Sequence, residues 1–387
     1  MLTEYVNSNN ISGDKPDVLM LLSNPATYDT RPLKEAESLA HNGYKVIIFA
    51  WDREGKASRQ FFSTNLVIQR FNLKAPYGQS IMTLLGFALF YTWCFINSLM
   101  MRFQVIHCHD VDTLPCGILL KISRGRCVKL VYDMHDHPSV FMNRFPKSET
   151  LVNLVFTFMR RYVDHLVVVN EGFVEYLAGK GFKKEKLTVI MNVPETAVEG
   201  PRLRESDVFR ILYYGSLSRV RGVHNLVRAV EPLSDVLLIL AGNGELVSWI
   251  TKLAEAHPHI SYLGWLPLSE IDKLIQTAHL IPTLYLPDNI NHALATPEKF
   301  FTSLASGIPV LVPERTYMAT LVRKYKCGLI VDLRSFISIR EAIMTLINDK
   351  CLYDRLARNG IKITRELFNW KFMEKRLLST YSILRNG

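Results

Sequence analysis

The stretch "ATPEKFFTSLASGIPVLVPE", residues 295–314, sets a short helical pattern directly before an aliphatic strand. Pro297 can occupy the first helical turn, while Gly307 and Pro309 end the helix and begin the strand. That first turn also carries Glu298 and Lys299. A helix N-terminus exposes unpaired N–H groups and the positive end of a dipole, so a lysine there predicts an anion site. Glu298 has the plainer explanation that it complements the same dipole.

Aliphatic runs alternate with helical stretches on both sides of this segment. The strands expected upstream are 17–24, 45–50, 105–109, 128–134, 165–170 and 187–192. A polar stretch at 193–207 reads as a linker, and the strands expected after it are 209–215, 235–242, 260–264, 280–286, 309–313 and 328–332. The helices between them include 31–44, 148–164, 222–231 and 298–306. Such alternation predicts an α/β fold of two Rossmann-like, doubly wound domains facing across a cleft, which is the default ligand site.

The composition limits the chemical classes of partner that this chain is expected to bind. The 387 residues carry a net charge of +10 with 48% apolar residues, which favours an anionic partner: a phosphorylated substrate, an anionic membrane face or nucleic acid. The lysines and arginines are scattered and no stacking-aromatic motif is present, which disfavours nucleic acid. The six cysteines lack metal-ligand spacing and the N-terminus is polar, so a cytoplasmic protein with reduced thiols is expected.

One uncharged segment, 80–101, is long enough to suggest a membrane span. It lies between the expected strands 45–50 and 105–109. If both strands belong to one parallel sheet, the segment is a crossover helix packed on that sheet and cannot span. We favour this interpretation, with part of the helix available to a membrane surface. The basic residues nearby that favour anionic lipid are Lys74, Arg102, Arg144, Lys147, Arg160 and Arg161.

Two further loops follow expected strand ends. In "YYGSLSRVRGVHNL" (213–226), Gly215 permits a tight exit, and Arg219 and Arg221 before a helix suit a diphosphate. In "LAGNGEL" (240–246), Gly242 and Gly244 would let a ligand approach the backbone closely, although Gly-Asn-Gly is also an ordinary turn.

These three stretches, in this order, resemble the donor half of GT-B glycosyltransferases, specifically the retaining family 4 type. "DTRPLKEAESLAHNGYKVIIFA", "VIHCHDVDTLPCGI", "KLVYDMHDHPSVF" and "FNWKFMEKRLLSTYSIL" are similar to other parts of the same enzymes, so the resemblance covers about 18–387. It implies an acceptor-binding domain (1–195), a nucleotide-sugar-binding domain (196–365) and a C-terminal helix (366–387) that crosses back to the first domain.

The resemblance also implies functional residues. Arg219, Arg221 and Lys299 would hold the diphosphate, and Ser216 stands where the family has an arginine that Arg219 could replace. His135 matches a histidine that contacts the donor sugar across the cleft; His109 with Asp110, and Asp136 with His137, are weaker candidates. The remaining donor-binding candidates are Gly215, Gly242, Gly244, Leu263, Trp265, Pro297, Glu298 and Thr302.

The family pattern is broken at Thr302. Its position usually carries a glutamate that holds the ribose hydroxyls, and an earlier glutamate aligns with Leu294. A hydroxyl is a weaker, neutral acceptor, so donor affinity or identity is expected to differ. Glu298, one helical turn away, is placed to compensate.

The resemblance implies transfer of a sugar from a nucleotide-sugar to a glycan or lipid-linked acceptor, as in bacterial surface polysaccharide synthesis, on the cytoplasmic side of the membrane. No cofactor is expected. "HDVD" (109–112), the nearest approach to an Asp-x-Asp metal motif, falls on the acceptor half, so transfer should be metal-independent. The alternative is a non-catalytic homologue that binds a nucleotide or a protein partner, motivated by the missing glutamates.

Overall fold

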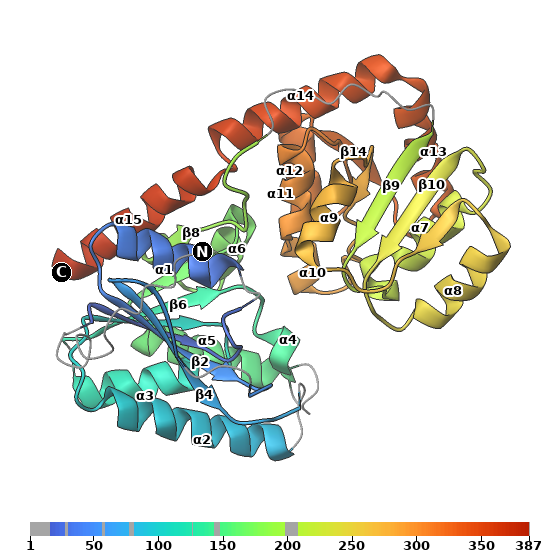
Figure 1. Cartoon of the computed structure of the whole chain (residues 1–387). Helices are drawn as coiled ribbons and strands as arrows, with labels where there is room; N and C mark the ends of the chain where they lie inside the picture. Colours follow the sequence, from blue (N-terminus) through green and yellow to red (C-terminus); the bar gives the residue numbers. More distant parts are fainter. Residues whose placement is uncertain are drawn as a thin grey trace. The chain divides into compact units, whose positions relative to one another are not determined.

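The computed structural model describes residues 16–27, 30–55, 59–76, 81–125, 127–142, 148–197 and 208–386. By its internal contacts the chain divides into two compact units. Unit 1 comprises Met1–Val168, Val174–Ile190 and Glu374–Gly387, and unit 2 comprises Val169–Phe173 and Met191–Met373. Figure 1 shows each unit as a sheet packed with helices. The predicted α/β class with two Rossmann-like domains is confirmed.

Unit 1 contains an eight-stranded sheet in the order β3-β4-β2-β1-β5-β6-β7-β8. Neighbouring strands run parallel, except that β3 is antiparallel to β4. The central strands are buried on both faces, as their aliphatic sequences require. The strands are β1 (Val18–Leu22), β2 (Val46–Asp52), β3 (Arg59–Ser63), β4 (Leu66–Asn72), β5 (Val105–His109), β6 (Lys129–Met134), β7 (His165–Val168) and β8 (Leu187–Val189).

The helices of unit 1 cover both faces of this sheet. Right-handed crossovers place α2, α3 and α5 on one face and α1 on the other, because the chain moves along the sheet in opposite directions. Figure 1 shows α2 and α3 side by side, with α1 and α15 across the sheet from them. The helices are α1 (Thr30–His41), α2 (Ile81–Ser98), α3 (Leu114–Arg124), α4 (Ser139–Met142), α5 (Ser148–Tyr162), α6 (Glu171–Gly179) and α15 (Trp370–Asn386), with a short 3₁₀ turn η1 (Lys184–Lys186).

Helix α2 is the crossover helix expected within 80–101. The strands at 45–50 and 105–109 do belong to one sheet, as β2 and β5. The crossover starts from β4, however, a strand that the sequence reading missed because Gln69 and Arg70 interrupt its apolar run. Among the described residues, no helix combines the length and hydropathy needed to cross a bilayer.

Unit 2 contains two three-stranded parallel sheets, β11-β10-β9 and β12-β13-β14. An isolated parallel bridge between Ile211 and Leu280 places β12 beside β9. The chain order of the strands reverses between β9 and β12, and this reversal is where open α/β sheets bind ligands beyond their carboxyl ends. The strands are β9 (Phe209–Tyr214), β10 (Val236–Ala241), β11 (Ile260–Tyr262), β12 (Ile281–Pro282), β13 (Val310–Pro313) and β14 (Gly328–Val331).

The helices of unit 2 pack on these strands through a core that includes Leu226, Leu238 and Leu311. Three of the helices, α10, α13 and α14, were not assigned from the sequence. The helices are α7 (Val223–Val230), α8 (Val247–Ala256), α9 (Leu268–Ile275), α10 (Ile290–Leu294), α11 (Glu298–Ala305), α12 (Tyr317–Tyr325), α13 (Phe336–Asn348) and α14 (Lys350–Glu366), with a 3₁₀ turn η2 (Arg219–Arg221).

The strand predicted at 280–286 is wrong in extent, since β12 has only two residues. Pro282 has no N–H to extend the ladder. Thr283 N still donates to Leu311 O at 2.9 Å, but Leu286 N donates instead to Val220 O at 3.0 Å. The chain therefore leaves the sheet toward η2, and brings the loop after β12 beside the predicted arginine loop. The predicted linker lies outside the described residues from 198 to 207.

Candidate functional site

Three loops at the carboxyl ends of β9, β10 and β11 are tied together through their backbones. Gly215 N donates to Ala241 O at 2.9 Å, and Gly242 N donates to Gly264 O at 2.7 Å. A Cβ at Gly242 would lie 1.9 Å from Gly215 O. The close approach that the sequence predicts at Gly242 is thus made by the neighbouring loop. Gly244 plays the same part beside Leu217, whose oxygen would lie 2.3 Å from a Cβ there.

Lys299 projects from the first turn of α11 to the end of β9. Its Nζ donates to Tyr214 O at 2.5 Å and lies 4.1 Å from the centre of the Tyr213 ring. A Cβ built on Gly215 would lie 3.4 Å from this Nζ, so the lysine reaches the strand exit itself. Burial, and secondarily the charge of Arg221, lower the pKa of Lys299 to about 7. The structure therefore places a buried amine with a lowered pKa at the reversal point of the sheet.

The two arginines of η2 are held differently. The guanidinium carbon of Arg221 lies 3.9 Å from the centre of the Tyr285 ring, a cation–π contact that fixes the side chain. Arg219 has an exposed side chain, and its main-chain N–H donates to Glu245 Oε1 at 2.8 Å. The charge of Arg221 is thus close enough to Lys299 to affect its pKa. The side chain of Arg219 is exposed to solvent.

Thr302 lies one turn beyond Glu298 on α11. Its side chain is close enough to Tyr214 to lower the pKa of that tyrosine, but burial together with Glu298 outweighs this effect and raises the pKa of Tyr214 above its usual range. The position that usually carries a glutamate is therefore matched here by a tyrosine–threonine pair. Pro297 corrects one expectation: it has extended backbone angles and precedes the first helical residue, Glu298, rather than lying within the first turn.

The remaining donor-binding candidates lie at the surface of the same loops. Gly215 and Ser216 are exposed at the end of β9, and Leu263 and Trp265 are exposed after β11, with Trp265 at 66% of its full accessibility. An exposed indole beside a strand exit offers a ring face for stacking. None of these residues is buried as part of the core.

A cavity of about 160 Å³ lies beyond the ends of β12, β13 and β14. It contains none of the predicted site residues. Its charged lining residues are Asp288, Glu314, Arg315, Asp332 and Arg334. Three carboxylates against two guanidiniums do not suit a diphosphate, so this cavity is not the anion site predicted from Lys299.

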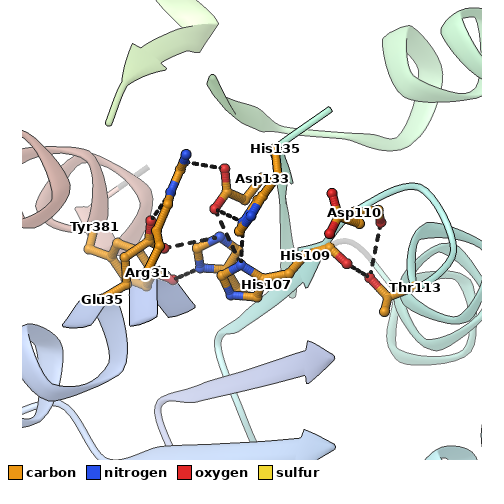
Figure 2. Close-up of polar contacts among 9 residues, drawn as sticks. All are labelled: Arg31, Glu35, His107, His109, Asp110, Thr113, Asp133, His135 and Tyr381. Atoms are coloured by element: carbon orange, nitrogen blue, oxygen red, sulfur yellow. Dashed lines mark hydrogen bonds and ion pairs between the residues drawn. The ribbon is translucent and has the colours of Figure 1, made fainter. Parts of the chain in front are cut away.

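Unit 1 contains a buried polar network that the sequence reading did not assemble (Figure 2). Arg31 and Glu35, four residues apart on α1, form an ion pair at 3.0 Å. His107 and His109 lie on the same face of β5, since alternate strand residues point the same way, and their rings stack with centroids 4.3 Å apart. Asp133 near the end of β6 bonds to Arg31. His107 Nδ1 lies 2.7 Å from the Tyr381 hydroxyl of α15.

His135 follows β6 and joins this network. Its Nε2 lies 2.8 Å from Asp133 Oδ2 and 3.3 Å from His109 Nδ1. Burial alone would lower the pKa of His135, but the carboxylates of Asp133 and Asp110 outweigh it and raise the pKa to about 10. Asp110 has a left-handed backbone with φ 63°, a strained conformation that is common at functional sites. The side chain of His135, just after the end of β6, is therefore held in place by Asp133.

The network also includes residue types that bind metals. Ligand-type atoms of Glu35, His107, His109 and Asp133 lie within 4.8 Å of one another. The guanidinium of Arg31, however, already bonds one oxygen of each carboxylate. Arg31 and His135 are bonded to these carboxylates, and we interpret the cluster as an ion-pair network, in which Glu35 Oε2 has no hydrogen-bond partner among the described residues.

The other two histidine candidates, His109 and His137, lie in different surroundings. His109 is buried inside the network, with Nδ1 3.2 Å from Asp133 Oδ2. His137 turns away from it: its ring nitrogens lie 2.8 Å from Ser139 Oγ and 3.1 Å from Tyr176 Oη, and burial lowers its pKa to about 4. Asp136 is exposed. His137 is thus a structural residue of unit 1.

Sequence reasoning missed Arg31, Glu35, His107, Asp133 and Tyr381 as site residues. The available signals were an Arg–Glu pair at i, i+4 within an amphipathic helix, and two histidines alternating in an otherwise aliphatic strand. In unit 2 it missed Tyr213, Tyr214 and Tyr285, whose signal was aromatic residues at strand exits.

Two family models match the chain. Residues 33–196 match Glycosyltransferase Family 4, and residues 199–363 match Glycosyl transferases group 1. Among curated relatives, the chain is 33% identical over 100 residues to alpha-galactosylglucosyldiacylglycerol synthase of Streptococcus pneumoniae, covering 23% of this chain and 26% of that protein. It is 24% identical over 183 residues to the capsular polysaccharide biosynthesis glycosyltransferase CapM of Staphylococcus aureus, covering 46% and 47%. The chain spans about half the length of the first curated relatives it matches.

Solved structures match over nearly the whole chain. Sucrose-phosphate synthase from Thermosynechococcus elongatus superposes with a TM-score of 0.76 at 15% identity, covering 96% of this chain and 99% of that one. HepE of Anabaena, solved in complex with UDP-glucose, superposes with a TM-score of 0.69 at 16% identity, covering 94% and 99%. At these identities the likeness establishes the fold.

Proposed function

The chain belongs to the glycosyltransferases of group 1 and family 4, and on this premise we propose that it transfers a sugar from a nucleotide-sugar, with retention of anomeric configuration, to a glycan or lipid-linked acceptor. We propose bacterial surface polysaccharide synthesis as the process. The likeness to CapM and to a diacylglycerol glycosyltransferase supports an acceptor that is a growing glycan or a glycolipid.

The observation that carries the proposal is the position of Lys299. Its amine lies at the exit of β9, where the strand order of unit 2 reverses, with Arg221 in electrostatic reach. Neither cation has an ion pair among the described residues of unit 2. Two protein cations beside a helix N-terminus favour a diphosphate over a neutral ligand.

The proposed reaction follows from this charge. The acceptor hydroxyl attacks the anomeric carbon from the face that the diphosphate leaves, so the bond from carbon to the departing oxygen breaks as the new glycosidic bond forms. Lys299 and Arg221 stabilise negative charge on the leaving nucleoside diphosphate, and Arg219 adds charge from the loop surface. Because these cations belong to the protein, we propose that transfer needs no divalent metal.

A nucleotide screen can identify the base and the sugar of the donor. The HepE complex supports testing UDP-sugars first, and the exposed Trp265 and Leu263 supply an apolar surface for a base. Thermal shift against UDP, GDP and ADP, followed by transfer assays with the matching sugars, tests the proposal. We expect one of the three nucleotides to raise the melting temperature of the protein. We also expect the nucleotide-sugar that contains this nucleotide to be consumed in the transfer assay. If a nucleotide binds and no sugar is ever transferred or hydrolysed, the non-catalytic alternative replaces this function; if none binds, the donor site is wrong.

We further propose that unit 1 contacts an anionic membrane on the cytoplasmic face. The outer side of α2 exposes an apolar surface, from Met82 at 64% to Ile96 at 59% of full accessibility, and α3 beside it exposes Leu119 and Ile122. Exposed Lys74, Arg102, Arg160 and Arg161 accompany this surface on unit 1, while Arg144 and Lys147 lie outside the described residues. An exposed apolar surface together with exposed basic residues on the same unit supports binding to anionic lipid and hence a lipid-linked acceptor.

A further inference from the structure

The Asp133 carboxylate in unit 1 accepts hydrogen bonds on both oxygens. Oδ1 bonds to the Arg31 guanidinium, while Oδ2 lies 2.8 Å from His135 Nε2 and 3.2 Å from His109 Nδ1 (Figure 2). Asp133 is fully buried. Burial would raise its pKa, but the charges of Arg31 and His135 outweigh burial and hold the pKa well below its usual range. An ionised carboxylate only accepts, so the His135 nitrogen that faces it must carry a proton.

The other ring nitrogen of His135 faces away from this network. Among the described residues, Nδ1 has no hydrogen-bond partner, whereas Nε2 is held by Asp133. The His135 side chain is 14% exposed, against 0% for Asp133 and 2% for His109. His135 is thus the member of the network that reaches the surface of unit 1, and its Nδ1 is the atom available to a ligand.

The charge of His135 depends on its surroundings as a whole. Arg31 and Glu35 interact with it from α1, His107, His109 and Asp110 from β5 and its end, Asp112 from the next residues of the chain, and Asp133 from β6. Arg31 and the neighbouring histidines oppose a positive charge, whereas Asp133 and Asp110 favour it. The carboxylate at 2.8 Å is the closest of these groups and decides the balance.

We propose that Asp133 is a positioning residue that holds His135 as an imidazolium, with its Nδ1–H directed outward to donate a hydrogen bond to an oxygen of the sugar substrate. This inference rests on the proposed function and deepens it. An imidazolium has no lone pair to accept a proton. His135 therefore cannot be the base for the acceptor hydroxyl, whose proton passes instead to an oxygen of the departing diphosphate as the glycosidic bond forms.

Histidine ¹⁵N NMR of the full chain tests the charge without any substrate, with His135→Gln identifying the signals. We expect both nitrogens of His135 to be protonated up to pH 8 or above. In Asp133→Asn the ring should titrate at or below its ordinary value of about 6.5, because burial and Arg31 then oppose the positive charge. A neutral His135 in the wild type at pH 7.5, or an unchanged titration in Asp133→Asn, overturns the proposal. The wild-type measurement can overturn the proposal by itself. The test therefore does not depend on whether Asp133→Asn folds.

Activity adds a second readout. In Asp133→Asn, kcat should fall as pH rises through the new titration of His135, whereas the wild type should show no such fall below pH 8. Glu35→Gln is the matched control, because it replaces the other carboxyl group that contacts Arg31 and leaves the Asp133–His135 contact in place. Its His135 should stay charged. If NMR finds the imidazolium and no nucleotide-sugar is transferred, the proposed function fails while the Asp133–His135 assignment stands; an equal loss of charge in Glu35→Gln overturns the assignment.

Discussion

Lys299 Nζ lies 2.5 Å from the main-chain oxygen of Tyr214, which joins the first turn of α11 to the last residue of β9. These two elements flank the point where the strand order of unit 2 reverses. A carbonyl oxygen orients the ammonium group without neutralising it. Among the described residues Lys299 has no carboxylate partner, so its charge remains available to an anion. This arrangement suits a leaving diphosphate and motivates the first two predictions.

Lys299→Ala should lower turnover by about 10²-fold or more, since loss of one preorganised charge at a leaving group costs about 3 kcal/mol of transition-state stabilisation. Steady-state kinetics and circular dichroism measure activity and fold. Lys273→Ala is the control, because Lys273 is exposed on α9 and forms its ion pair with Glu270 on the same helix. Near-normal turnover in Lys299→Ala would remove the lysine from the mechanism.

Donor affinity should weaken as pH rises above 7. Burial and Arg221 lower the pKa of Lys299 to about 7, so the free protein loses this charge over the range in which an exposed lysine keeps it. Binding of the diphosphate requires the protonated form, and each pH unit above the pKa then weakens binding by up to about tenfold. Calorimetry with a non-transferable nucleotide-sugar analogue from pH 6 to 9 measures the slope.

Lys299→Arg is the informative comparison for this pH dependence. A guanidinium stays charged throughout that range, so the slope should flatten even if absolute affinity changes. If the arginine variant keeps the wild-type slope, another group titrates and the assignment to Lys299 is wrong.

Much of this fold could be predicted because it is encoded locally. Aliphatic runs separated by amphipathic stretches identify β1, β5, β9 and β10, and Gly307 and Pro309 do end α11. What failed depends on distant partners. Strand β4 has polar Arg70 within a buried run, and its side chain donates to Pro25 O at 2.8 Å, a residue far away in sequence.

The residues of the candidate site also differ in whether they could be predicted from local sequence. Lys299 and Arg221 could be predicted because a strand exit and a helix start are visible in sequence. The network around Asp133 could not, since α1, β5, β6 and α15 meet only through the strand order. Likewise Tyr214 and Thr302 lie 88 positions apart in sequence, and their proximity gives Thr302 a neighbour that the comparison with a glutamate does not suggest.

Thr302→Glu should tighten nucleotide binding by about two- to tenfold. The new carboxylate can accept from the Tyr214 hydroxyl and from ribose hydroxyls, and a charged acceptor is stronger than a neutral one. Repulsion from Glu298, one turn away, limits the gain. Calorimetry measures the dissociation constant, with Thr302→Gln as the uncharged control of similar size. A large loss of both binding and activity would show that the threonine is matched to an unusual donor.

Chelation should leave turnover unchanged. In unit 1, Arg31 forms ion pairs with Glu35 and Asp133. In unit 2, Lys299 and Arg221 are the cations proposed to bind the diphosphate. Initial rates are compared in EDTA and in added Mg²⁺ or Mn²⁺ after dialysis. A loss of more than about tenfold in EDTA, restored by one metal, would show that these protein cations do not suffice.

The membrane prediction rests on the α2 surface and its charges. Leu85 and Leu89 are more than half exposed on the same helix, which would be costly in water unless a partner covers them. Arg160 and Arg161 are exposed on α5, and each basic residue near an anionic surface contributes about 1 kcal/mol of attraction. Binding should therefore combine a salt-sensitive part from the arginines and a salt-insensitive part from the leucines.

Sedimentation with vesicles containing anionic phospholipid separates the two parts. The wild type should pellet at low salt and less at high salt, and Arg160→Glu with Arg161→Glu should weaken low-salt binding by about tenfold or more. Leu85→Glu should weaken binding at every salt concentration, because it interrupts the apolar contact. Ile383→Glu is the control, since Ile383 is equally exposed but lies on α15, across the sheet from α2. If the wild type stays in the supernatant at low salt, or if Ile383→Glu weakens binding as much as Leu85→Glu, then α2 is not the membrane surface and the lipid-linked acceptor loses its main support.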